Sequence, residues 1–166
     1  MTPLEGFLAT WSRALRTFGD GVPVPGSQIC ASSVLRELKA QVQSAAPVDY
    51  WRGAAAADYA RSSDVHGEEL GKLADLDARL ACEIDESAQV VARGRAELDD
   101  VRARVVGAAS SVPDGMTGQI MVMPIVSQGL DQLDAVLSKA NAELNAIGIR
   151  IRQIGAEYAR LIQVRS

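Results

Sequence analysis

The chain has 166 residues, a formal net charge of −4 and only 4% aromatic residues. Its length predicts a single helical domain over residues 1–166, large enough to bury a core without a disulfide or a metal ion. The mild negative charge excludes a protein that binds nucleic acid through a basic face, so we expect no nucleic-acid partner.

The first predicted element is a helix over residues 3–18. Its apolar residues recur at spacings of three and four: Leu4, Phe7, Leu8, Trp11, Leu15 and Phe18. Thr2 is a suitable N-cap and Pro3 suits the first helical position. The same stretch lacks the basic start and uninterrupted apolar run of a secretory signal. Glycines and prolines then predict a loop from about Gly19 to Ser27.

The second predicted helix covers residues 28–46, with Ser27 as a plausible cap. Pro47 ends it, because the residue before a proline is disfavoured in the helical region. A third, long helix is predicted over residues 54–111. Its apolar seam follows alternating steps of three and four residues: Leu70, Leu73, Leu80, Ile84, Val91, Leu98, Val101 and Val105. Asp77, Ser87 and Gly94 interrupt this seam, which favours a helical bundle over a two-stranded coiled coil.

The last predicted helix covers residues 124–164, after a break at Ser110–Gly118. The run IMVMP at 120–124 fits either a short extended piece or the approach to this helix. Gly148 and Gly155 should weaken or bend the helix. No apolar run reaches the roughly 20 residues of a membrane span, so we expect a soluble chain.

The basic end of this last helix has two interpretations. Four arginines lie among Ile and Leu there: Arg150, Arg152, Arg160 and Arg165. They fit contact with a membrane surface or a partner. The interpretation we favour is a helix packed on the others with its arginines outward.

The stretch PVDYWRGAAAADYARSSD, residues 47–64, predicts the corner of an antiparallel helical hairpin. Gly53 can adopt backbone angles that other residues avoid, and Trp51 can cover the ends of both helices. Asp49 can cap the turn or favour the N-terminus of the helix that follows. The alternative is that Trp51 is only a core residue near a loop.

This corner resembles the W-x-G motif of proteins exported by type VII (ESX) secretion systems. The segments WRGAAAADYA, LADLDARLACEID and ELDDVRARV are similar to the helical N-terminal domain of the EspA/EspE group of mycobacterial secretion-associated proteins. The similarity covers about Leu35 to Pro113 and includes Trp51, Gly53 and Tyr59. It implies an all-helical substrate or partner of a type VII apparatus, virulence-associated in that group, exported by a route that needs no signal peptide.

One feature of such export signals is missing. They include a tyrosine followed four residues later by Asp or Glu. Ala54, Ser63 and Ile162 occupy that position after the three tyrosines, Tyr50, Tyr59 and Tyr158. Either a partner supplies the signal or the chain itself is not recognised for export.

Other candidate sites have simpler explanations. The only histidine, His66, has Asp64, Glu68 and Glu69 at spacings that do not converge on a metal. The aspartate pairs Asp75/Asp77 and Asp99/Asp100 point apart and indicate a solvated face.

The two cysteines are predicted to be unbonded to each other. If facing residues in the hairpin have numbers that sum to about 104, Cys30 faces about residue 74, and Cys82 lies roughly 12 Å beyond. A disulfide needs closer α-carbons. Cys30 is then the better candidate for an intermolecular link, and either cysteine can simply be a small buried residue.

The prediction is an all-α protein: a long antiparallel hairpin with a W-x-G corner, extended to a three- or four-helix bundle. We expect no enzyme, cofactor or metal, but a type VII secretion-associated substrate or partner that binds a helical protein, itself or the secretion machinery. A cytosolic adaptor or chaperone is the main alternative. A membrane-active secreted effector is the second.

Overall fold

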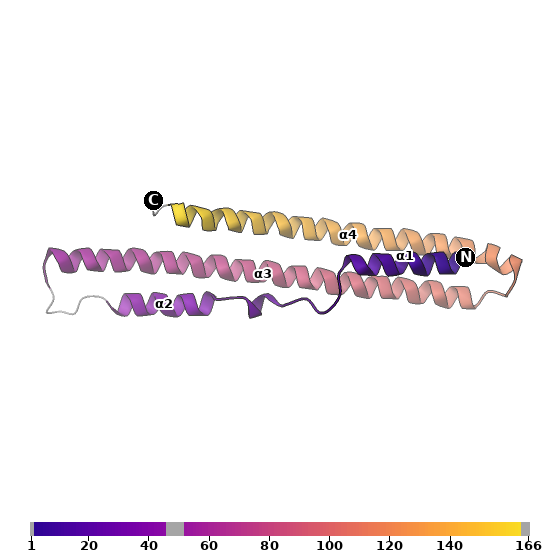
Figure 1. Ribbon diagram of the computed structural model, residues 1–166, viewed down its shortest axis with the longest axis horizontal. Coiled ribbons are helices and arrows are strands. Elements are labelled where there is room, and N and C mark those ends of the chain that lie inside the picture. The colour runs from indigo at the N-terminus through magenta and orange to yellow at the C-terminus, as the bar shows by residue number, and fades with distance from the viewer. Residues whose placement is uncertain (1, 46–51, 164–166) are drawn as a thin grey trace. The chain divides into compact units, whose positions relative to one another are not determined.

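The computed structural model describes residues 2–45 and 52–163. Over these residues the chain forms four α-helices and one short 3-10 helix, η1 (Gly26–Gln28). The α-helices are α1 (Pro3–Thr17), α2 (Ser32–Ser44), α3 (Ala54–Ser110) and α4 (Met116–Gln163) (Figure 1). The predicted all-α class is confirmed.

The helices are organised in two compact units. Unit 1 comprises Met1–Pro23 and Ser87–Ile147, and unit 2 comprises Val24–Glu86 and Gly148–Ser166. Helices α3 and α4 contribute to both units, whereas α1 belongs to unit 1 and α2 to unit 2. That the whole chain is one domain stays a prediction.

Helix α1 begins as its sequence predicts. The Thr2 side chain accepts the Glu5 backbone N–H at 3.2 Å, and a Glu5 carboxylate oxygen accepts the Thr2 N–H at 2.7 Å. This capping box satisfies two backbone donors at the helix start. The same hydrogen bonds from Thr2 lower the pKa of Glu5, because they stabilise the charged carboxylate.

The predicted start of α2 is wrong by four residues. The helix begins at Ser32, and its N-cap, Ala31, has no side-chain hydrogen bond. Ser27 lies inside η1 instead. The Asp77 carboxylate on α3 accepts the Ala31 N–H, so a distant side chain supplies the acceptor that a local cap would give.

The predicted start of α4 is also wrong. The helix begins at Met116, and Pro124 lies inside it. IMVMP is therefore helical. A proline within a helix removes one hydrogen bond and costs about 3 kcal/mol. Here Val122, Ile125 and Val126 pack into the core around Pro124, and their burial offsets that cost.

This longer helix also changes the expectation about membrane spans. By length and composition, α4 is apolar enough to cross a membrane, with a mean hydropathy of 1.2 over its most apolar 18 residues. Polar residues and Pro124 interrupt the apolar residues of this helix, so no uninterrupted apolar run reveals it. The core helix of a soluble protein passes the same test but is mostly buried, whereas only 17% of this stretch is buried.

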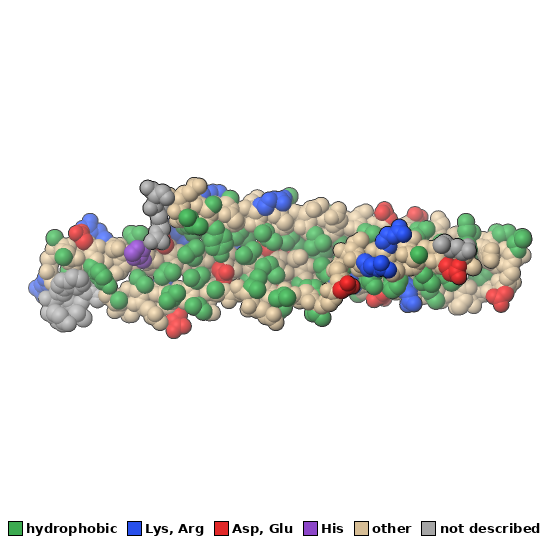
Figure 2. Space-filling view, in the orientation of Figure 1, with side chains coloured by type: hydrophobic (Ala, Val, Ile, Leu, Met, Phe, Trp, Pro, Cys, Tyr) green, Lys and Arg blue, Asp and Glu red, His purple; other side chains and the backbone are tan. Residues whose placement is uncertain are grey.

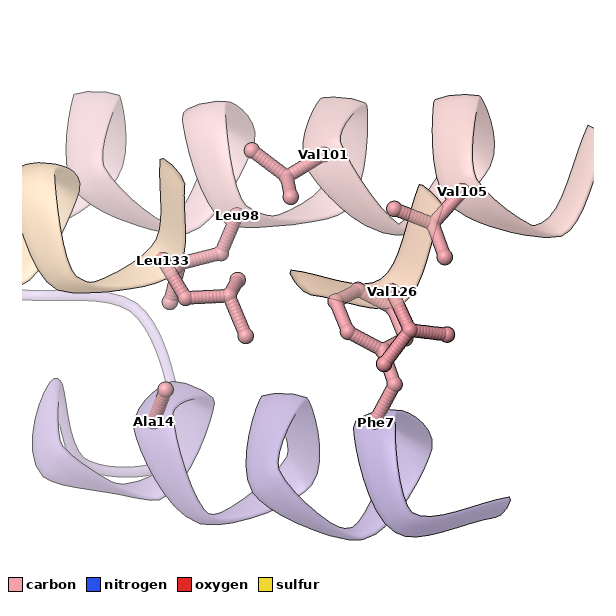
Figure 3. Packing of buried hydrophobic residues seen from close by; sticks show 7 residues of the cluster. All are labelled: Phe7, Ala14, Leu98, Val101, Val105, Val126 and Leu133. Atoms are coloured by element: carbon pink, nitrogen blue, oxygen red, sulfur yellow. The ribbon is translucent and has the colours of Figure 1, made fainter. Parts of the chain in front are cut away.

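The main hydrophobic core lies in unit 1, where α1, α3 and α4 meet. Its buried members are shown in Figure 3: Phe7, Ala14, Leu98, Val101, Val105, Val126 and Leu133. Phe7 fits against Gly129 of α4, where a β-carbon would lie 2.9 Å from its ring. Phe18 fits against Gly94 of α3 in the same way, at 2.5 Å. Gly94, one of the interruptions in the predicted seam, is thus a socket for an aromatic ring.

Polar contacts fasten α1 to α3. The Trp11 indole N–H donates to the Leu98 carbonyl at 3.1 Å, and the Arg102 guanidinium lies 4.9 Å above the Trp11 ring. Beyond the end of α1, the Arg95 guanidinium donates to the carbonyls of Phe18, Gly19 and Gly21. We call these three hydrogen bonds the Arg95 clamp. Together with the contacts of the Trp11 ring, the clamp holds α1 over the α3 seam.

Candidate interaction surface

The predicted W-x-G corner is only partly within the described residues. Trp51 lies outside them. Gly53 has φ +118°, a conformation that favours glycine, and α3 begins directly after it at Ala54 as predicted. Tyr59 is exposed on the second turn of α3. The functional role of all three residues stays a prediction.

Helix α2 packs antiparallel to α3 in unit 2, with a register different from the one predicted. Gln43 lies against Gly67, Lys39 against Gly71, and Arg36 forms an ion pair with Asp75. The predicted register would place residue 71 opposite about residue 33, so it was shifted by about six residues. Helix α2 ends at Ser44, and α3 begins at Ala54.

The segment before α2 is seated on α3 by contacts that the sequence did not reveal. The Gly26 N–H donates to the Asp85 carboxylate at 2.6 Å. A β-carbon on Gly26 would lie 2.0 Å from the Ala81 carbonyl oxygen, so only glycine fits. Asp77, predicted to be part of a solvated face, instead accepts the Ala31 N–H as described above.

On α4, the arginines predicted to point outward are partly engaged. Arg150 donates to Glu83 at 2.8 Å and to Glu86 at 2.8 Å. Arg79 of α3 makes a bidentate contact to Glu157 at 2.8 and 3.0 Å. Hydrogen bonds from Arg79 lower the pKa of Glu157, and those to Glu157 raise the pKa of Arg79. Arg152 and Arg160 are exposed as predicted, and Arg165 lies outside the described residues.

The predicted α3 seam is more deeply buried in unit 1 than in unit 2. In unit 1, Leu98, Val101 and Val105 are buried, and Val91 is half-buried. In unit 2, every large apolar seam residue of α3 remains half-buried: Leu70, Leu73, Leu80 and Ile84. The buried α3 side chains of unit 2 are mostly small, such as Ala74 and Ala81. The unit 2 seam therefore lacks the cover that α1 gives in unit 1.

Apolar side chains of α2 add to this open seam. Val34 is 56% exposed and Leu38 is 42% exposed, one helical turn apart. Figure 2 shows hydrophobic side chains gathered between α2 and the end of α4, over α3. A second group of exposed apolar residues lies at the start of α4 in unit 1: Met116, Ile120, Met121 and Met123. Exposed apolar patches of this kind mark sites of interaction.

No group of three or more metal-ligating side chains occurs among the described residues. His66 is exposed, and Cys30 and Cys82 are free. Cys82 is exposed rather than a small buried residue, because the packed face of α3 passes through its neighbour Ala81. Asp99 and Asp100 are exposed, as expected for a solvated face. Burial raises the pKa of Tyr158, and the nearby Asp77 and Cys30 raise it further.

Comparison with known proteins assigns this helical chain to a class of secretion-associated proteins. The sequence model of the EspA/EspE family matches residues 18–100, half of the chain. The chain belongs to the EspA/EspE family and is a type VII secretion-associated protein. Neither a curated protein nor a solved structure matches it.

Proposed function

We propose that this protein is a substrate or partner of a type VII secretion system and acts, without catalysis, by binding other helices. The open apolar seam of unit 2 supports this proposal most directly. Half-buried leucines in a row along a helix are typical of a surface that a further helix covers. Family membership supplies the secretion context. A signal-peptide-independent secreted or surface location follows from the same proposal.

Two alternative functions are each supported by one specific observation. A cytosolic adaptor or chaperone is consistent with the absence of an acidic residue four positions after any tyrosine. A membrane-active secreted effector is consistent with the exposed apolar residues at the start of α4 and with the hydropathy of that helix. We favour helix binding because the apolar surface of unit 2 involves three helices.

Fractionation tests the export role. The tagged chain is expressed in an actinobacterial host with an intact type VII system and in the same host with that system deleted. We expect it in the culture filtrate of the intact strain only, and Trp51→Ala should reduce export if the corner is recognised. A folded, abundant protein retained in the intact strain's lysate would contradict the substrate proposal and favour the adaptor. Binding to liposomes in proportion to added lipid would favour the effector.

A further inference from the structure

A cleft in unit 2 lies between the first half of α3 and the last turns of α4. Its volume is about 390 Å³, within the range of sites that hold small molecules. The apolar part of its wall comes from Leu76, which is buried, and from Leu161, which is half-buried. None of the half-buried seam leucines of α3 lines it, so the cleft is separate from the surface proposed for helix binding.

Basic side chains outnumber acidic ones on the wall of this cleft. Three cations and two carboxylates line it: Lys72, Arg79, Arg160, Asp75 and Glu157. Arg79 makes the bidentate contact with Glu157. Lys72 and Arg160 are exposed, and neither forms an ion pair within residues 2–45 and 52–163. Both side chains can therefore turn toward a bound anion without breaking an existing ion pair.

The carboxylates of the cleft are already engaged by cations. Asp75 pairs with Arg36 of α2 at 3.4 Å, which brings a further positive charge to this part of unit 2. Hydrogen bonds from Arg79 lower the pKa of Glu157 most, and the charge of Arg160 lowers it further. The surroundings therefore favour the charged form of a carboxylate, and an anionic ligand beside Arg160 would be stabilised in the same way.

The apolar part of the wall determines what such an anion must be attached to. An apolar chain that lies against Leu76 and Leu161 leaves water, and the hydrocarbon stems of the basic side chains extend this apolar surface. A bare inorganic anion would leave the leucines in contact with water. A neutral hydrocarbon would leave the two unpaired cations without a partner. A ligand with both parts uses the whole wall.

We propose that this cleft binds one anionic amphiphile with a single short apolar chain, of the size of a medium-chain fatty acid. Lys72 and Arg160 hold its charged head group, and its chain lies along Leu76 and Leu161. The inference goes beyond the proposed function and does not depend on it, because neither helix binding nor export requires this ligand.

Calorimetric titration of the purified full-length chain with octanoate tests the site, and circular dichroism confirms that each variant is folded. We expect one octanoate per chain. Lys72→Gln and Arg160→Gln should each weaken binding about three- to fivefold, because each removes one exposed ion pair with the ligand. Glu157→Gln should strengthen binding, because Arg79 then also faces the head group. Arg152→Gln is the matched control, since Arg152 is an exposed cation of α4 in unit 2 that does not line the cleft.

The two parts of the ligand are tested separately. Acetate carries the head group alone and octanol carries the chain alone, so both should bind far more weakly than octanoate. Leu161→Asn should weaken the binding of octanoate while the chain stays folded. Octanoate that does not bind, or octanol that binds equally well, would overturn the inference. An equal loss of affinity in Arg152→Gln would overturn it too, as would unchanged affinity in both Lys72→Gln and Arg160→Gln.

A competition experiment distinguishes a free amphiphile from the head group of a membrane lipid. Vesicles of phosphatidylcholine and phosphatidylglycerol are added to the complex with octanoate. We expect no displacement, because the proposed ligand is a free single-chain molecule. Displacement that is lost in Arg160→Gln would overturn that source and assign the head group to an anionic membrane lipid.

Discussion

The two units are built from the same two long helices, yet one is closed and the other is open. In unit 1, α1 covers α3 and α4 with two phenylalanines and a tryptophan, and the seam residues Leu98, Val101 and Val105 are buried. In unit 2, α2 and α4 each pack on α3, but its seam leucines stay half-exposed. The difference teaches that a heptad pattern marks a surface for helix packing without saying whether the same chain supplies the helix.

The largest expected difference comes from truncating the seam in each unit. Phe7→Ala removes a fully buried ring and should cost about 3–5 kcal/mol of local stability. Leu73→Ala removes a half-exposed side chain and should cost only about 1–2 kcal/mol. Native-state hydrogen exchange in dilute solution measures each unit separately. Equal losses would contradict the distinction between a closed and an open seam.

The glycines should respond to alanine with opposite signs. A β-carbon at Gly129 would lie 2.5 Å from Val105 and 2.9 Å from the Phe7 ring. We expect crowding of about 1–3 kcal/mol to exceed the gain in helix propensity. Gly155→Ala meets no neighbour and should stabilise the folded chain by about 0.5–1 kcal/mol. Thermal unfolding in dilute solution measures the change in stability of each variant. Destabilisation by both variants would show that the surface at Gly155 is not open.

Removing the Arg95 clamp should loosen α1 alone. Its guanidinium donates to three carbonyls after α1, and hydrogen bonds from a charged donor contribute about 1.5–3 kcal/mol. Arg95→Gln should therefore increase hydrogen exchange in α1 by roughly tenfold or more. Exchange in α2 should be unchanged and serves as the internal control. An equal increase in both helices would show that the clamp is not local to unit 1.

The smallest effect expected is that of pH on unit 2. The pKa of Glu157 is lowered by Arg79, so the folded chain holds its proton less tightly than the unfolded chain. The stabilisation is present above the unfolded pKa, near 4.5, and is lost as pH falls through the folded pKa. The pair is exposed, so the effect is small. Thermal unfolding between pH 6 and 3 should depend less on pH in Glu157→Gln than in the wild type.

The sequence predicted the helices well and their contacts less well. Local signals sufficed for Thr2 at the start of α1 and for Gly53 before α3. The start of α2 depends on Asp77, 46 positions along the chain, and no local pattern contains that information. Helix α4 continues through Pro124 because tertiary burial outweighs a local penalty. The exposure of the unit 2 seam could not be predicted from the sequence either, because a buried and a half-buried heptad pattern have the same spacing.

The central claim is that the α3 seam is closed in unit 1 and open in unit 2. Hydrogen exchange along α3 as a function of protein concentration tests it most directly, because this one helix carries both parts of the seam. We predict slow exchange at residues 98–105 at every concentration. Exchange at residues 70–84 should be faster in dilute solution and should slow only when another helix covers the seam. Strong, concentration-independent protection of both segments would contradict the account, because it would show that the unit 2 seam is closed within a single chain.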